Sequence, residues 1–131
     1  MLWLVLAAAV LVRGAWGEEG QRVRTLVDYR QELGLSAGQI QEIAVTLRRF
    51  QEDTTTLKLK LVAAEREVAS SLDRRAHLAV IKGHLRQVEE LRYQVRLLDV
   101  ETSRKVESIL SADQLRKWHS IQARTRPKGA P

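Results

Sequence analysis

Two short stretches with nearly the same sequence constrain this chain more than any other feature. Residues 35–40 read Leu-Ser-Ala-Gly-Gln-Ile, and residues 110–115 read Leu-Ser-Ala-Asp-Gln-Leu. In a capping box the serine oxygen accepts from the N3 amide, while the glutamine three residues later reaches back to the N-cap amide. Each stretch therefore predicts the first turn of a helix, with Ser36 and Ser111 as the N-cap residues.

The apolar residues around each box predict how the chain enters these helices. An apolar residue before the N-cap often packs against one at N4, an arrangement called a hydrophobic staple. Both stretches place a leucine before the serine and an aliphatic residue at N4. The eight residues that we expect to shape the fold in this way are Leu35, Ser36, Gln39, Ile40, Leu110, Ser111, Gln114 and Leu115.

The segment between the two boxes contains no proline and repeats apolar residues at helical spacing. A first heptad seam predicts a helix from Ala37 to about Ser70, ~50 Å long. A second seam, less regular, predicts a helix from about Arg74 to Ile109 with Asp73 as its N-cap. The predicted seam residues are Ile40, Ile43, Leu47, Phe50, Thr54, Leu57, Leu61, Ala64, Val68 and Ser71, then Leu78, Ile81, Leu85, Val88, Leu91, Val95, Leu98, Thr102, Val106 and Ile109.

Shorter helices are expected on either side of this pair, over residues 22–33, ended by Gly34, and over residues 112–123. The run of three threonines at residues 54–56 lowers helix propensity, so we expect a bend or a weakened turn there, with a continuous helix favoured over a break. Gly83 has two interpretations, a close approach of another backbone or a tolerated weak point. The expected fold is all-α, a long antiparallel helical hairpin with short N- and C-terminal helices.

The N-terminus is typical of a secretory signal peptide. Residues 2–12 are an uninterrupted apolar run, and Ala15 and Gly17 supply small residues at −3 and −1 before Glu18. A retained anchor is the alternative, but these 11 residues fall short of the ~20 that span a bilayer. We expect cleavage of residues 1–17, one helical domain over residues 18–123 with no membrane span, and a disordered basic tail over residues 124–131.

The charge balance narrows the choice of partners. Removing residues 1–17 takes away one charged side chain, Arg13, and leaves 21 basic against 16 acidic residues, a net charge of +5. For an exported chain, this positive charge favours acidic polypeptides, anionic lipid surfaces or unfolded proteins over nucleic acid. The chain has no cysteine, which suits an oxidising compartment.

The sequence contains no nucleophile elbow, phosphate-binding loop, dinucleotide-binding glycine pattern or cysteine-based metal site. We therefore expect neither an enzyme nor a bound cofactor. His77 and His84 share a helix face but lie ~10.5 Å apart along its axis, too far to hold one ion. Solvated histidines are favoured over the alternative, a metal site across a dimer interface that could include His119.

The predicted helices carry more apolar surface than one hairpin can bury. Apolar residues off the two seams are Ala44, Val45, Leu59, Val62, Ala63, Leu97 and Val100. This surplus must meet a second chain, a bound protein or water, and a two-fold homodimer is the default solution. Three cations, Lys58, Lys60 and Arg75, have no acidic residue three or four positions away. With Phe50 they are candidates for a binding face, against the alternative of a solvated helix surface.

The two Leu-Ser-Ala-x-Gln stretches resemble the two LTxxQ motifs of the Spy/CpxP family of periplasmic proteins. The spacing is similar too, since one motif precedes the first long helix and the other precedes the last helix. Serine replaces threonine in both motifs of this chain, which is neutral for capping. The resemblance covers about residues 26–122.

The resemblance implies a cradle-shaped antiparallel homodimer in the periplasm. It implies an ATP-independent chaperone that binds unfolded or misassembled envelope proteins during envelope stress, with the periplasmic domain of a sensor kinase as a further partner. Related branches, similar to ZraP and CnrX, bind or sense heavy metals. A metal-responsive regulator of an envelope signalling system, for zinc, nickel or copper, is therefore the alternative function.

Overall fold

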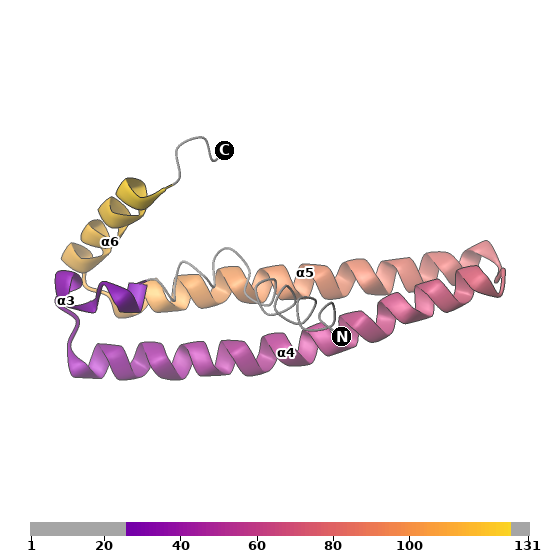
Figure 1. Ribbon diagram of the computed structural model, residues 1–131, viewed down its shortest axis with the longest axis horizontal. Helices are drawn as coiled ribbons and strands as arrows, with labels where there is room; N and C mark the ends of the chain where they lie inside the picture. Colours follow the sequence, from indigo (N-terminus) through magenta and orange to yellow (C-terminus); the bar gives the residue numbers. More distant parts are fainter. Residues whose placement is uncertain (1–25, 127–131) are drawn as a thin grey trace, which may run out of the picture.

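The computed structural model describes residues 26–126, and this part of the chain contains helices and no strand. The helices are α3 (Arg30–Leu33), α4 (Ala37–Asp73), α5 (Leu78–Ile109) and α6 (Ala112–Thr125). Figure 1 shows α4 and α5 side by side and antiparallel, with α3 and α6 at the end where α4 begins and α5 finishes. The predicted all-α class and long hairpin are confirmed.

Both predicted capping boxes form. The Ser36 hydroxyl accepts from the Gln39 amide at 3.1 Å, and the Ser36 amide donates to Gln39 Oε1 at 2.9 Å. The same two bonds at Ser111 and Gln114 measure 3.2 and 2.9 Å. Each box satisfies two amide groups that would otherwise lack a partner at a helix start, so α4 and α6 begin at the predicted residues.

The helix before the first box is shorter than predicted. Residues 26–28 are helical, Tyr29 interrupts them, and α3 then adds a single turn; residues 22–25 lie outside the described part of the chain. Gly34 ends α3 as predicted, with a φ of 66°. In this left-handed conformation its amide donates to carbonyls of α3, and glycine adopts it without a side-chain clash.

The turn of the hairpin differs from the prediction. Asp73 is the last residue of α4, and His77 caps α5 without a side-chain hydrogen bond, so Asp73 as an N-cap is wrong. Arg75 takes the left-handed conformation, with a φ of 51°. The amides of residues 74, 75 and 76 donate to the last carbonyls of α4, at Ser70, Leu72 and Ser71. These bonds complete the C-terminus of α4 and delay the start of α5 to Leu78.

The seam of α4 is confirmed along its whole length. Its ten predicted residues are all buried or half-buried against α5 and the end helices. The three threonines at residues 54–56 do not break the helix, which is continuous from Ala37 to Asp73. The hydroxyls of Thr55 and Thr56 donate to the carbonyls of Gln51 and Glu52, so these side chains bond within the helix.

The seam of α5 is confirmed except near the turn. Leu78 and Leu85, predicted to be buried, are 64% and 46% exposed. The contact stripe drifts around the helix at this end, and half-buried Ile81 and His84 continue it towards Val88. A Cβ added to Gly83 would meet nothing within 4 Å, so the close backbone approach considered for this glycine does not occur within the described chain.

The apolar core consists of two separate clusters. The larger lies at the end of the hairpin, where both end helices pack on α4 and α5; its buried members are Leu26, Leu33, Ile43, Val106, Leu110, Trp118 and Ile121. We call this region the closed end. The smaller lies between the middle parts of α4 and α5 and consists of Ala64, Val88 and Leu91 with half-buried leucines and Val68 around them.

The sequence predicts a signal peptide at one end of the chain and a basic tail at the other, and both lie mostly outside residues 26–126. The predicted signal peptide, residues 1–17, lies outside the described residues, as do residues 127–131 of the predicted tail. α6 continues two residues beyond its predicted end, to Thr125. Among the described helices none is both long and apolar enough to cross a membrane.

Candidate functional site

The two capping glutamines bond directly to each other. Gln39 Nε2 donates to Gln114 Oε1 at 2.7 Å, and Gln114 Nε2 donates to Gln39 Oε1 at 3.1 Å. The second hydrogen of each amide group goes to a backbone carbonyl: Gln39 donates to Ile109 at 3.0 Å and Gln114 donates to Gly34 at 3.1 Å. We call this arrangement the amide pair.

The amide pair satisfies both side chains completely. A glutamine amide offers two donors and an oxygen with two acceptor sites. In each residue the oxygen accepts from its own N-cap amide and from the other glutamine, and both donors are used. The pair therefore ties the start of α4 to the end of α5 and the start of α6, across 75 residues of sequence.

Sequence reasoning assigned Gln39 and Gln114 to helix caps and missed their contact with each other. The available signal was the similarity of the two motifs, because both glutamines occupy the N3 position of their helices. What brings them together is the antiparallel hairpin, which returns the second motif to the first. The predicted staple residues Leu35, Leu110 and Leu115 pack in or against the closed-end cluster.

A layer of polar side chains lies between the two apolar clusters. Its buried members are Thr46, Thr54, Asp99, Thr102 and Ser103. Neither Asp99 nor Ser103 was predicted to be buried. Asp99 acts electrostatically on Lys58 of the opposite helix. Burial lowers the pKa of Lys58, and the carboxylate of Asp99 opposes that shift.

A small cleft opens beside this polar layer, between α4 and α5. Its volume is about 160 Å³, below the ~300 Å³ at which drug-sized ligand sites begin. Basic and acidic side chains stand at its edge, among them Arg49, Asp53 and Lys105, and Phe50 contributes to its lining. Such a cleft has room for one side chain of a bound polypeptide and not for a cofactor.

Most of the surplus apolar surface predicted from the sequence is exposed. The exposed large apolar side chains are Val45, Leu59, Val62, Leu72, Leu78, Val80, Leu85, Tyr93, Leu97 and Val100. Tyr93, Leu97 and Val100 follow one another at helical spacing on the side of α5 turned away from α4, about half a turn from the seam. We call these three residues the back of α5. Leu59 likewise lies about half a turn from the seam of its helix, on the side of α4 turned away from α5.

The four residues predicted for a binding face do not share one surface. Phe50 is 3% exposed and lies at the cleft. Lys58 is half-buried, whereas Lys60 is exposed, and a separation of two residues turns them ~200° apart on α4. Arg75 lies in the turn of the hairpin, ~22 Å along the helix from Lys60. Lys58 has its acidic neighbour on the other helix, which local spacing could not reveal.

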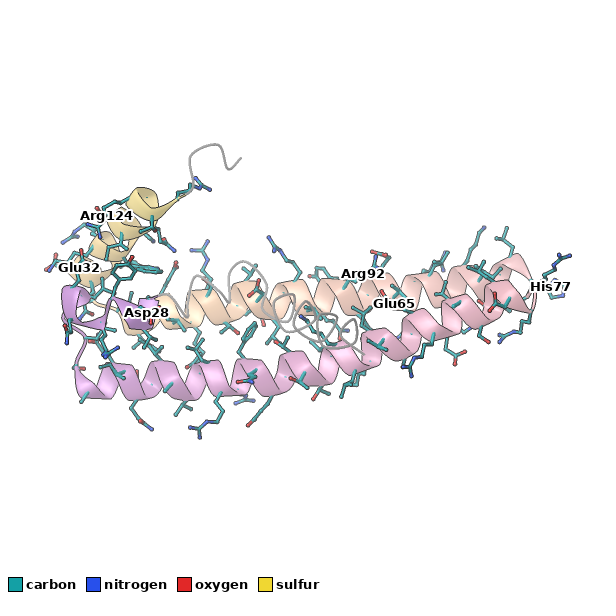
Figure 2. The ribbon with its side chains drawn as sticks, viewed as in Figure 1. Asp28, Glu32, Glu65, His77, Arg92 and Arg124 are labelled. Carbon is teal, nitrogen blue, oxygen red and sulfur yellow. The ribbon has the colours of Figure 1, made fainter. Side chains whose placement is uncertain are left out.

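Two ion pairs fasten neighbouring elements at opposite parts of the rod (Figure 2). Arg92 of α5 contacts Glu65 of α4 at 3.0 Å, and Arg124 of α6 contacts Glu32 of α3 at 3.3 Å. All four side chains are about half exposed, so solvent screening leaves each pair only a small contribution to stability. These pairs support the fold and do not form a site.

Metal ligands are dispersed over the described residues. No group of three His, Cys, Asp or Glu side chains that could hold an ion occurs in residues 26–126. His77 lies at the turn (Figure 2), His84 is half-buried on α5, and His119 is 3.9 Å from Glu107. The three histidines therefore lie apart within one chain.

Comparisons with known proteins return no relative of this chain: no family model, no curated protein and no solved structure matches it. The resemblance to the Spy/CpxP family thus depends on the two motifs and on their position in the hairpin.

Proposed function

We propose that this protein is a periplasmic, ATP-independent chaperone of the Spy/CpxP kind that binds unfolded or misassembled envelope proteins. One observation carries the proposal: a hairpin with a small core leaves ten large apolar side chains exposed. Exposed apolar surface on this scale is typical of proteins that bind other polypeptides. The predicted export signal and the two motifs support the compartment and the family.

The back of α5 is the proposed contact for bound polypeptides. Tyr93 offers a large amphipathic ring, and Leu97 and Val100 extend the apolar surface along the same side of the helix. Arg96 and Arg104 are exposed close by. Apolar side chains flanked by cations suit the mixed apolar and acidic segments that an unfolded protein exposes, without selecting one sequence.

We propose a two-fold homodimer with a cradle shape as the working form of the protein. The surplus apolar surface on α4, at Val45, Leu59 and Val62, is available for a second copy. A dimer that buried this surface would leave the back of α5 for bound proteins. Analytical ultracentrifugation of the wild type and of Leu59→Gln/Val62→Gln tests this division, because the substitutions should shift the equilibrium to monomer.

Suppression of aggregation tests the function. Purified residues 18–131 should keep several chemically denatured proteins in solution at near-stoichiometric ratio without ATP. Tyr93→Gln/Leu97→Gln should weaken this suppression severalfold. The matched control, Leu78→Gln/Leu85→Gln, also removes two exposed apolar side chains from α5 but should retain suppression. No suppression of any client, or equal loss in both variants, would overturn the proposal or its assignment to the back of α5.

The alternative from the sequence, a metal-responsive regulator, gains no supporting ligand cluster from residues 26–126. Calorimetric titration of the same protein with zinc, nickel and copper separates the two functions. Binding tighter than ~10 μM, about −7 kcal/mol, together with no suppression of aggregation, would favour the regulator.

A further inference from the structure

The turn of the hairpin is far from the closed end and carries a distinctive surface. We call residues 72–86 the tip; Figure 2 places His77 at the extreme end of the rod. Four large apolar side chains of the tip are exposed, namely Leu72, Leu78, Val80 and Leu85. The two apolar clusters of the core include no residue of the tip.

The tip also concentrates positive charge. It contains four basic residues, Arg74, Arg75, Lys82 and Arg86, and one acidic residue, Asp73, for a net charge of +3. The other described residues contain 14 basic and 13 acidic side chains, a net charge of +1. Most of the net charge of the described chain is therefore carried by 15 residues at one end.

These cations are available to a partner. All four are exposed, and none of them forms an ion pair with another described residue. The one side-chain hydrogen bond among them joins Arg74 to the hydroxyl of Ser70 at 3.2 Å. Lys82 and Arg86 stand four residues apart on α5, so they share a face. The same face carries Leu78 and Leu85, which the seam predicted to be buried.

We propose that the tip docks on the surface of an anionic lipid bilayer. Exposed leucines among Lys and Arg side chains, on one face of a helix, are the pattern of interfacial membrane binding: the apolar groups enter the headgroup boundary and the cations meet lipid phosphates. A lipid surface is the expected partner because a net charge of +3 on 15 residues complements a continuous anionic surface. The tip shares no residue with the back of α5, the proposed contact for bound polypeptides, and its binding to lipid has a different readout.

The absence of cysteine allows a site-specific test on residues 18–131, the chain expected after cleavage of the signal peptide. Ala79→Cys places one environment-sensitive fluorophore at the tip, on the same side of α5 as Arg86, and Ser120→Cys places the same dye on α6 at the closed end. Vesicles containing phosphatidylglycerol should shift the emission of the tip label to the blue and should change the label at residue 120 far less. Vesicles of phosphatidylcholine alone should give a much smaller shift, and added salt should weaken the response.

Substitutions in the labelled protein then separate charge from apolar contact. Lys82→Gln/Arg86→Gln should lower the partition coefficient on anionic vesicles about fivefold for each charge, on the order of 25-fold in total. Its matched control, Arg48→Gln/Arg96→Gln, removes two exposed cations outside the tip and should change binding only slightly. Leu78→Gln/Leu85→Gln should weaken binding, whereas Tyr93→Gln/Leu97→Gln should not.

Three results would overturn the proposal. One is an equal response of the two labels, which would place another segment of the chain on the lipid. Another is an equal loss in the tip and control charge variants, which would indicate non-specific attraction. The third is a response of the tip label to polyglutamate but to no vesicle, which would assign the tip to an acidic protein. The chaperone assay, measured without lipid, stands or fails separately from all three.

Discussion

The closed end and the tip are the two ends of one helical hairpin, and they differ in almost every physical respect. At the closed end Ile43 and Val106 are fully buried, Trp118 packs on Tyr29, and the amide pair joins the helix starts. At the tip the large apolar side chains are exposed and the cations lack ion pairs within the described chain. Two continuous helices can therefore bury most of their stabilising contacts at one end and expose the side chains of the other end to binding partners.

Substitution of buried residues should show this difference most strongly. Trp118→Ala removes a side chain that is 3% exposed at the closed end, and we expect a loss of ~3–5 kcal/mol from the free energy of unfolding. Leu85→Ala is the matched change at the tip and should cost less than ~0.5 kcal/mol. Urea unfolding followed by circular dichroism measures both. Similar losses would contradict a closed end that dominates stability.

The amide pair can be separated from the helix caps by Gln39→Glu. A glutamate at N3 keeps the capping oxygen but has no hydrogens to donate to Gln114 and to the carbonyl of Ile109. We expect the free energy of unfolding to fall by ~2–3 kcal/mol, because the part-buried network loses two hydrogen bonds and receives a negative charge.

Ser36→Ala provides the control for this prediction, because it removes the cap and retains the amide pair. It should cost ~1 kcal/mol. If the two variants lose the same stability, capping alone explains the glutamine. If Ser36→Ala instead abolishes client binding in a folded protein, these residues belong to the binding site and not to the scaffold.

Two glycines sharpen the comparison with opposite expected signs. Gly83→Ala, in the tip, should stabilise the protein by ~1 kcal/mol, because the added methyl group meets open space in a helix. Gly34→Ala, at the closed end, should destabilise it by ~1–2 kcal/mol, because the φ of 66° is strained for alanine. Thermal unfolding of both variants measures the effects. A destabilising Gly83→Ala would reveal a contact at that position.

The smallest effect concerns Lys58 in the polar layer, between the two ends. Burial lowers its pKa from 10.5, so the folded protein releases this proton at a lower pH than the unfolded chain does. Stability contributed by this residue should therefore rise as the pH increases towards 10.5, where both states become neutral. Urea unfolding of the wild type and of Lys58→Met across this window tests it. A constant difference between them would contradict the shift.

Local sequence was sufficient for the helix starts and for the α4 seam. Ser36 and Ser111 cap their helices by bonds within four residues, so nothing distant decides them. The regular heptad pattern placed every seam residue of α4 correctly, because burial along a straight helix follows its period. The turn was less predictable. Asp73 is a good capping residue, but the carbonyls at the end of α4 were satisfied by the backbone of residues 74–76 instead.

The sequence pattern did not predict the contacts between residues far apart in the chain. Asp99 and Ser103 were not expected in the interior, and the sequence around Lys58 contains no hint of the carboxylate that acts on it. The predicted binding residues Phe50, Lys60 and Arg75 were grouped by type, and the fold distributes them over a cleft, a helix surface and a turn.

The sequence by itself determined an all-α chain, the positions of its helix caps and the presence of more apolar residues than a hairpin can bury. These properties depend on hydrogen bonds within one turn and on residue periodicity, which a linear sequence contains. Only the tertiary structure decided that Gln39 meets Gln114 and that Leu78 and Leu85 are exposed at a basic tip. These facts depend on how the second helix returns along the first and on where its contact stripe drifts, and both are set by packing between residues far apart in the chain.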